Sequence, residues 1–175
     1  DQKLVASLGE RNVITLLVFH RSEIDIDIVE SVEVPVERES DVAGGGLGRA
    51  EALALAAAGA RVVVNDLPGA ANEAVEEIAS RGGEARVVEG DVGERSTADA
   101  MLAAAVDGFG SLDIVVNNAG MTRDRMLFNM SDEEWDTVLR IHLRGHFLLS
   151  RHAASYWRGI AKSTGDPVYG RIVNT

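Results

Sequence analysis

A run of glycines followed by a helix, a strand and an acid constrains the fold of this chain more than any other feature. Residues 43–66 read AGGGLGRAEALALAAAGARVVVND. The glycines permit a tight turn whose backbone N–H groups approach phosphates, and the helix expected over residues 49–58 directs its positive end at them. The apolar strand that follows ends at Asp66, about 20 residues beyond the glycines, where a carboxylate can accept hydrogen bonds from a ribose. The complete unit predicts a dinucleotide site.

The composition excludes several classes of partner and site. The 175 residues suffice for one domain with a core. The net charge of −11 argues against nucleic-acid and anionic-membrane partners, which are themselves polyanions. The absence of cysteine excludes disulfides, cysteine nucleophiles and thiolate metal sites. No signal peptide is visible, and the apolar segment 13–19 is too short to span a bilayer. We therefore expect a cytoplasmic protein.

Helix and strand patterns alternate after Asp66. Helices are expected over residues 70–80, from a cap at Ser96 or Thr97 to Phe109, and from a capping box at Ser131 and Glu134 towards Trp157. Strands are expected over residues 85–89, 112–116 and 171–174. This alternation predicts an α/β protein with a Rossmann-like, doubly wound parallel sheet, truncated after about the fifth strand.

The segment before the glycines fits this architecture poorly. Residues 13–19 predict a strand, residues 24–28 alternate as an edge strand does, and Pro35 argues against a central strand over residues 32–36. Residues 37–41 are charged where a buried strand should lead into the turn. We therefore divide the chain into an atypical N-terminal segment, residues 1–42, and a partial dinucleotide-binding domain, residues 43–175, with an atypical first strand.

Four motifs carry a family resemblance. GGGLGRAEAL, the strand end VVVND, GDV at residues 90–92 and LDIVVNNAG at residues 112–120 resemble the short-chain dehydrogenase/reductase family over roughly residues 43–175. Residues 123–157 are similar to the branch that contains the 3-hydroxyacyl-CoA dehydrogenase domains of multifunctional fatty-acid enzymes. The resemblance implies an NAD-dependent oxidoreductase that acts on a secondary alcohol or ketone, and the similarity to this branch suggests a 3-hydroxyacyl thioester.

The resemblance also implies roles at the glycine turn and the strand end. Gly46, Leu47 and Gly48 would lie along the cofactor pyrophosphate, and Asp66 would hold the adenosine ribose. An acid at this position repels a 2′-phosphate, so NAD is favoured over NADP.

The resemblance implies further cofactor-binding roles at the ends of the next two strands. Asp91 would meet the adenine edge through its side chain, and Val92 through its backbone. Asn117, Ala119 and Gly120 would line the ribose on the nicotinamide side and support the neighbouring strand.

Simpler interpretations exist for these residues. Asp66 can be a solvated acid at a strand end, Asp91 a turn cap, and Asn117 and Asn118 turn formers. Arg49 could contact a phosphate, although a solvated helix position is the simpler interpretation.

Two histidines invite a metal interpretation. His142 and His146 lie four residues apart, but no acid at metal-ligand spacing and no third ligand accompany them, so we expect no metal site.

The catalytic motif of the family, Tyr-x-x-x-Lys, is absent. Four residues beyond Tyr156 stands Ile160, and four beyond Tyr169 stands Val173. The family's catalytic serine would fall after Thr175. We therefore assign no catalytic residue to this chain.

Two further positions depart from the family pattern. The Thr-Gly pair that normally precedes the turn is replaced by Asp41 and Val42, and the asparagine of the long helix is replaced by His142. A frameshift or misread start before Ala43 is one hypothesis for the abrupt beginning of the resemblance.

Three functional hypotheses remain open. The chain is a fragment of an oxidoreductase, a catalytically silent protein that binds NAD or an adenine nucleotide, or a non-functional truncated product. The parent enzyme would take a small-molecule substrate and assemble as a homo-oligomer through its long helix. The sequence identifies neither the substrate nor the direction of reaction.

Overall fold

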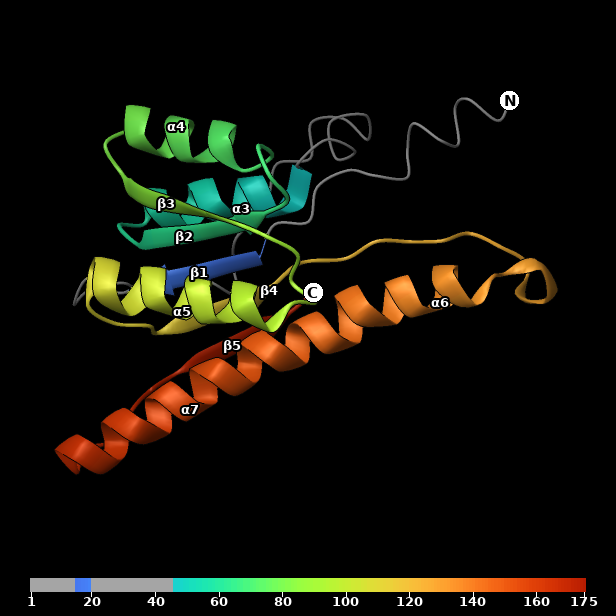
Figure 1. The fold of residues 1–175 in the computed structure, drawn as a ribbon. Coiled ribbons are helices and arrows are strands. Elements are labelled where there is room, and N and C mark those ends of the chain that lie inside the picture. Colours follow the sequence, from blue (N-terminus) through green and yellow to red (C-terminus); the bar gives the residue numbers. More distant parts are fainter. Residues whose placement is uncertain (1–14, 20–45) are drawn as a thin grey trace.

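The computed structural model describes residues 15–19 and 46–175, which form a five-stranded sheet with helices on both faces (Figure 1). The elements are β1 (Thr15–Phe19), α3 (Gly46–Ala57), β2 (Arg61–Asp66), α4 (Asn72–Ser80), β3 (Glu84–Glu89), α5 (Arg95–Phe109), β4 (Ile114–Asn117), the 3-10 turn η1 (Leu127–Asn129), α6 (Asp132–Leu139), the π-helical turn η2 (Arg140–Gly145), α7 (His146–Thr164) and β5 (Arg171–Asn174). The edge strand predicted over residues 24–28, the proline-containing segment 32–36 and the turn at Gly44 and Gly45 lie outside the described residues.

The sheet has the strand order β3-β2-β1-β4-β5. β2 runs parallel to β3, with Asp66 beside Glu89, and β4 runs parallel to β5, with Asn117 beside Asn174. The connections through α4 and α7 are the crossovers that the alternating sequence pattern predicts. The α/β fold class is thereby confirmed.

The central strand β1 runs in an unexpected direction. It is antiparallel to both neighbours, with Thr15 opposite Asn65 and Leu16 opposite Val116. An empty slot between β2 and β4 would leave the backbone N–H and C=O groups of two strands without partners, and an antiparallel strand can satisfy them as well as a parallel one. The apolar run predicted as a strand over residues 13–19 thus supplies the atypical first strand.

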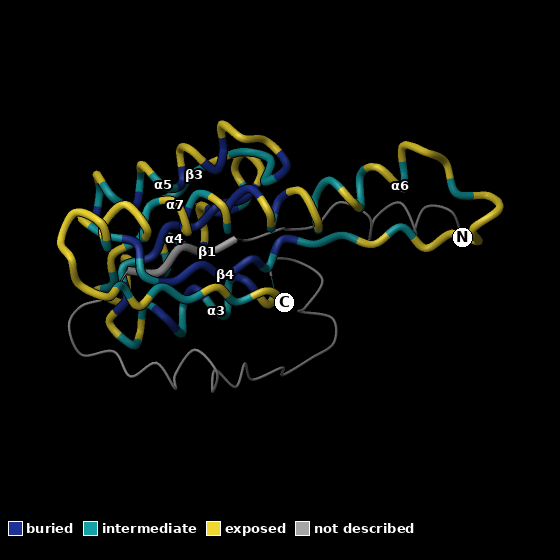
Figure 2. Tube along the Cα trace, turned by 90° about the horizontal axis from the view of Figure 1, so that it is seen from below, coloured by how far each residue is buried: buried dark blue, intermediate teal, exposed yellow. Residues whose placement is uncertain are grey.

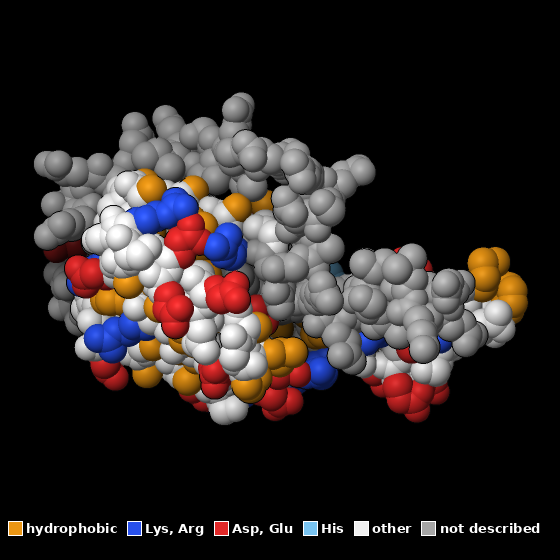
Figure 3. Space-filling view, turned by 90° about the horizontal axis from the view of Figure 1, so that it is seen from above, with side chains coloured by type: hydrophobic (Ala, Val, Ile, Leu, Met, Phe, Trp, Pro, Cys, Tyr) orange, Lys and Arg blue, Asp and Glu red, His pale blue; other side chains and the backbone are white. Residues whose placement is uncertain are grey.

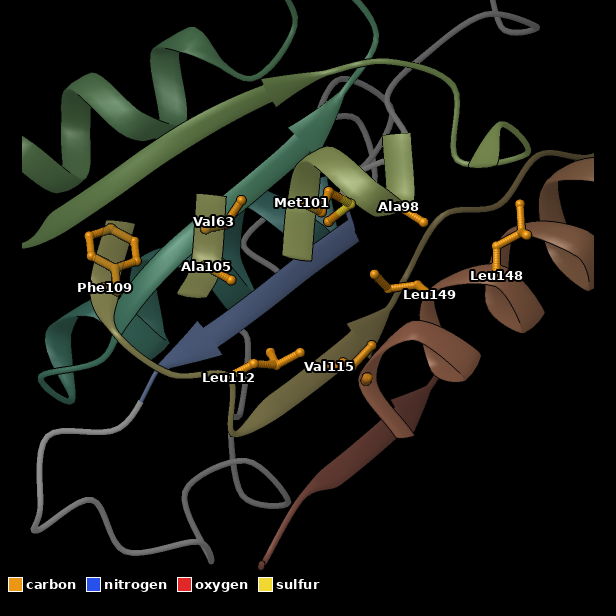
Figure 4. Packing of buried hydrophobic residues seen from close by; sticks show 10 residues of the cluster. Val63, Ala98, Met101, Ala105, Phe109, Leu112, Val115, Leu148 and Leu149 are labelled. Atoms are coloured by element: carbon orange, nitrogen blue, oxygen red, sulfur yellow. The ribbon is translucent and has the colours of Figure 1, made fainter. Parts of the chain in front are cut away.

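Two apolar clusters hold the helices on opposite faces of the sheet. Because side chains alternate along a strand, Val62 and Val64 face α3 and α4 while Val63 faces α5 and α7. Figure 4 shows the second cluster, whose members come from β2, β4 and three segments of helix and loop. They are Val63, Ala98, Met101, Ala105, Phe109, Leu112, Val115, Leu148, Leu149 and Ala153. Figure 2 shows that β2 and β4 are buried whereas most of α6 is exposed.

One continuous helical arm is formed by α6, η2 and α7, and its α6 end extends beyond the sheet (Figure 1). The predicted capping box opens it: the backbone N–H of Glu134 donates to Ser131 Oγ at 3.2 Å, and that of Ser131 donates to the Glu134 carboxylate at 3.1 Å. The arm continues beyond Trp157 to Thr164 and ends at Gly165, whose φ is +79°. No described helix is long and apolar enough to cross a membrane.

Two predicted helix starts are wrong. α3 begins at Gly46 rather than Arg49, so Gly46 to Gly48 form its first turn, and Gly48 is buried there. α5 begins after Glu94, which makes no side-chain cap, so neither Ser96 nor Thr97 is the cap. Thr97 is instead buried against Gly90, where an added Cβ would lie 2.5 Å from Thr97 Oγ1.

Candidate functional site

The predicted nucleotide-site residues of β2 and α3 lie at the same end of the sheet, the one where β2 terminates. A helix joined to the next strand by a short turn runs antiparallel to it, so the first turn of α3 lies at the edge where β2 ends with Asp66. The N-terminal amides of α3 and the Asp66 carboxylate are the donors and acceptors that phosphates and ribose hydroxyls require. This donor set fits a dinucleotide.

The strand end at Asp66 is rigidly held. Asp66 is 2% exposed, its Oδ1 accepts a hydrogen bond from the Leu67 N–H at 2.7 Å, and its backbone carbonyl accepts one from the Gly90 N–H at 2.9 Å. The Asn65 amide donates to the carbonyls of Val88 and Gly90 at 2.8 and 3.1 Å. Asp66 is therefore not the solvated acid of the simpler interpretation.

The turn that follows β3 contains Asp91 and Val92. Asp91 Oδ1 accepts a hydrogen bond from the Gly93 N–H at 2.7 Å, as a turn cap does, and its Oδ2 forms an ion pair with Arg140. The turn-cap interpretation of Asp91 is confirmed. The contact with adenine stays a prediction, since a capped carboxylate still has lone pairs for another donor.

Asn117 ends β4 with its amide fully enclosed. Its Nδ2 donates to Asn174 Oδ1 at 2.8 Å and to Ser150 Oγ at 3.2 Å. Its backbone carbonyl accepts a hydrogen bond from the Thr175 N–H at 3.2 Å. These bonds give Asn117 the predicted role of supporting the neighbouring strand.

Two histidines pack against the loop that follows β4. His142 Nε2 lies 2.9 Å from the Met121 nitrogen and 2.8 Å from the Met121 carbonyl oxygen, and His146 Nε2 lies 3.3 Å from the carbonyl oxygen of Ala119. A Cβ on Gly120 would lie 2.7 Å from His142 Cε1, so only glycine fits there. These rings hold the Ala119–Gly120 backbone in place.

The three histidines of the arm bond to protein groups rather than converging on one point. His152 joins α7 to α5, with Nε2 2.8 Å from Asp99 Oδ1. No group of three histidine or acidic side chains that could hold a metal occurs among residues 15–19 and 46–175.

Neither tyrosine has the environment of an acid–base catalyst. Burial raises the pKa of Tyr156, and the Asp113 carboxylate adds to the rise, which is the opposite of the shift that activates a phenol near neutral pH. Tyr169 is 72% exposed.

The sequence alone did not reveal Arg140, Arg144 and Ser150 as supports of the site. Arg144 Nε donates to the Gly93 carbonyl at 2.8 Å, beside the Arg140–Asp91 ion pair, and Ser150 bonds to Asn117. The four-residue spacing of the two arginines indicates a shared helix face. Their partners, Asp91 and Gly93, lie 49 and 51 residues away in the sequence.

Comparisons with known proteins agree with this geometry. Residues 42–175 match the family model described as Enoyl-(Acyl carrier protein) reductase. The chain is 62% identical over 140 residues to the hydroxyacyl-CoA dehydrogenase ChsB1 of Mycobacterium tuberculosis, covering 76% of this chain and 44% of that protein. It is 46% identical over 143 residues to the peroxisomal multifunctional enzyme type 2 of Mus musculus, covering 76% of this chain and 18% of that protein.

A solved structure shares the fold. The crystal structure of a short chain dehydrogenase from Mycobacterium avium superposes with a TM-score of 0.71 at 50% identity, over 74% of this chain and 50% of that one. The chain therefore spans half or less of the length of these relatives. From the matched residues, the strand-end geometry and these identities, we conclude that the chain belongs to the short-chain dehydrogenase/reductase family.

Proposed function

We propose that this chain is the nucleotide-binding part of an NAD-dependent oxidoreductase that acts on a secondary alcohol or ketone, with 3-hydroxyacyl thioesters as the substrate class. The observation that carries the proposal is the buried Asp66 carboxylate at the end of β2, at the same edge as the first turn of α3. The hydroxyacyl-CoA dehydrogenase relative, 62% identical over 140 residues, supports the substrate class.

Each predicted contact has a chemical role at this end of the sheet. The amides of Gly46, Leu47 and Gly48 bind the pyrophosphate because they lie in the first turn of α3, where helical N–H groups lack intrahelical partners. Asp66 binds the adenosine ribose and disfavours a 2′-phosphate by charge repulsion, so we propose NAD rather than NADP.

The remaining contacts divide between the two ends of the cofactor. Asp91 and Val92 meet the adenine, while Asn117, Ala119 and Gly120 line the ribose on the nicotinamide side. The bound nicotinamide would supply a hydride acceptor or donor at its C4 atom, and this chain's residues would orient it.

Turnover requires an acid or base for the substrate oxygen, and the family's Tyr-x-x-x-Lys motif does not occur within these 175 residues. A catalytically silent NAD- or adenine-nucleotide-binding protein is the second candidate. Binding and turnover must be measured separately.

The first experiment is a fluorescence titration of the chain with NADH and NADPH. We expect saturable binding, with NADH favoured by at least about tenfold, and Asp66→Ala should abolish the preference while Asp107→Ala, an exposed acid on α5, should preserve it. Absence of saturable NADH binding would refute the nucleotide function. Saturable binding without oxidation of a 3-hydroxyacyl-CoA would favour the silent binder.

We also propose that a second copy docks on the exposed face of the arm. Trp135, Leu139, Leu143 and Phe147 recur every four residues and are 52, 38, 68 and 55% exposed. The last three line an open surface depression of about 510 Å³ together with Asp136, Arg140 and Arg144. Met126, Leu127 and Phe128 are also exposed, and hydrophobic side chains gather at the end of the arm in Figure 3. Light scattering should show an oligomer that Leu143→Glu dissociates and Asp107→Ala does not.

A cytoplasmic location is proposed on the absence of cysteine and on the lack of a membrane-spanning helix among the described residues. Cell fractionation tests it, and recovery with membranes would contradict it.

A further inference from the structure

Two arginines of the π-helical turn η2 bind the loop that follows β3. Arg140 Nη1 forms an ion pair with Asp91 Oδ2, and Arg144 Nε donates to the backbone carbonyl of Gly93 at 2.8 Å. The loop adds its own bonds, from the Gly93 N–H to Asp91 Oδ1 at 2.7 Å and from the Glu94 N–H to the Asp91 carbonyl at 3.0 Å. Asp91 and Gly93 are thus held from both the helix and the loop.

Two glycines let this loop and the arm approach closely. A Cβ on Gly93 would lie 2.7 Å from Arg140 Cγ, and a Cβ on Gly145 would lie 2.9 Å from Val92 Cγ2. A larger residue at either position would force the neighbouring side chain to shift. The position of the loop is determined by the arm, and not only by the strand that precedes it.

Resting on the proposed nucleotide function, we propose that Arg140 and Arg144 are positioning residues that orient the Asp91 carboxylate towards the 6-amino group of adenine. A carboxylate has about four lone-pair sites, and the bonds from Arg140 and Gly93 occupy one on each oxygen. The ion pair fixes the rotation of the carboxylate and leaves acceptor positions for the amino group.

The ion pair is shielded enough to hold its geometry. The side chains of Asp91 and Arg140 are 29 and 38% exposed, whereas those of the Arg95–Asp99 pair on α5 are 68 and 56% exposed. Pairs exposed to that degree contribute little because water screens them. Loss of Arg140 would free the Asp91 side chain to rotate towards solvent.

The binding test compares NADH with its hypoxanthine analogue, in which a carbonyl oxygen replaces the 6-amino group. Fluorescence titrations would use the wild-type chain, Arg140→Met, Arg140→Lys and Arg144→Met. The matched control is Arg151→Met on the same arm, since Arg151 lies over the Phe147 ring, 5.3 Å from its centroid, and not against the loop after β3.

We expect the wild-type chain to bind NADH about tenfold more tightly than the analogue, because the carboxylate accepts a bond from the amino group and is repelled by the carbonyl. Arg140→Met should reduce this ratio to below about threefold, Arg144→Met should reduce it less, and Arg140→Lys should partly restore it. Arg151→Met should retain the wild-type ratio. An unchanged ratio in Arg140→Met would overturn the proposal.

Amide hydrogen exchange in the nucleotide-free chain separates this inference from the proposed function. Arg140→Met should speed exchange at residues 91–94, and Arg151→Met should not. If exchange rises but the wild-type chain binds no NADH, the nucleotide function and the adenine role are both refuted, and the arginines only fasten the loop. If NADH binds with an unchanged analogue ratio, the nucleotide function stands and this inference alone fails.

Discussion

The Asn117 side-chain amide donates a hydrogen bond to Asn174 Oδ1, 2.8 Å away, and so joins the ends of β4 and β5. The same amide donates to Ser150 Oγ on α7 at 3.2 Å, and Asn117 is 1% exposed. One buried side chain thereby connects two strands and a helix at the edge where the nucleotide is proposed to bind. Removing a buried side-chain amide of this kind costs free energy because each of its hydrogen bonds contributes to stability.

Asn117→Ala should lower the free energy of unfolding by about 1–3 kcal/mol, since it removes the two hydrogen bonds that the buried Asn117 amide donates to Asn174 and Ser150. For a chain of this size the midpoint of thermal unfolding should fall by about 2–10 °C. Asn118→Ala is the neighbouring control and should have a smaller effect, because Asn118 accepts one bond from Thr175 and is only partly buried. Equal midpoints for wild type and Asn117→Ala would contradict the structural role.

Glu51 on α3 should make stability fall as pH rises. Burial raises the pKa of Glu51 from 4.5 to about 7, so between these pH values the unfolded chain releases a proton that the folded chain retains. The free energy of unfolding therefore decreases through this window. In urea unfolding, Glu51→Gln should gain on the order of 1 kcal/mol relative to wild type between pH 5 and pH 8, after allowance for solvent screening. Glu73→Gln, an exposed acid on α4, should show no such gain.

His146 should remain neutral to lower pH than an ordinary histidine. Burial lowers its pKa below 6.5 and the nearby His142 lowers it further, against the opposing effect of the Ala119 carbonyl. As pH falls below 6.5, His146 is protonated in the unfolded chain before it is protonated in the folded chain. The free energy of unfolding therefore decreases towards acid pH. Proton NMR should place the imidazole midpoint of His146 below 6.5, and His142→Asn should raise it. A midpoint at or above 6.5 in the wild-type chain would refute the shift.

Loss of the Ser131 cap should open α6 locally rather than unfold the protein. α6 has no buried residue, and its first turn depends on the reciprocal Ser131–Glu134 bonds. Ser131→Ala should cost about 1 kcal/mol locally, which corresponds to about fivefold faster hydrogen exchange over residues 132–139. The thermal midpoint should hardly change. Ser163→Ala is the control, because its hydroxyl bonds only to the Ile160 carbonyl of its own helix. A large fall in the midpoint of Ser131→Ala would show that the cap supports the whole fold.

The strands after the glycines could be predicted because each carries its own apolar run. Residues 61–66, 84–89, 114–117 and 171–174 form the expected strands to within two residues at each end. The predicted nucleotide-site acid Asp66 followed from the same pattern, since it closes a buried strand. The helix starts at Gly46 and Arg95 could not be placed in the same way, because they depend on packing against other segments.

The amino-acid sequence by itself determined the alternation of strands and helices, the edge at which Asp66, Asp91 and Asn117 gather, and the lack of a lysine four residues after either tyrosine. Periods of two and 3.6 residues and the short αβ connections suffice for these features, since they are local. Only the tertiary structure decided that β1 lies antiparallel at the centre of the sheet and that Arg140 and Arg144 hold the Asp91 turn. The direction of β1 depends on which backbone groups of β2 and β4 need hydrogen-bond partners. The contacts of Arg140 and Arg144 join residues 49 and 51 apart in the sequence. A local sequence pattern contains neither kind of information.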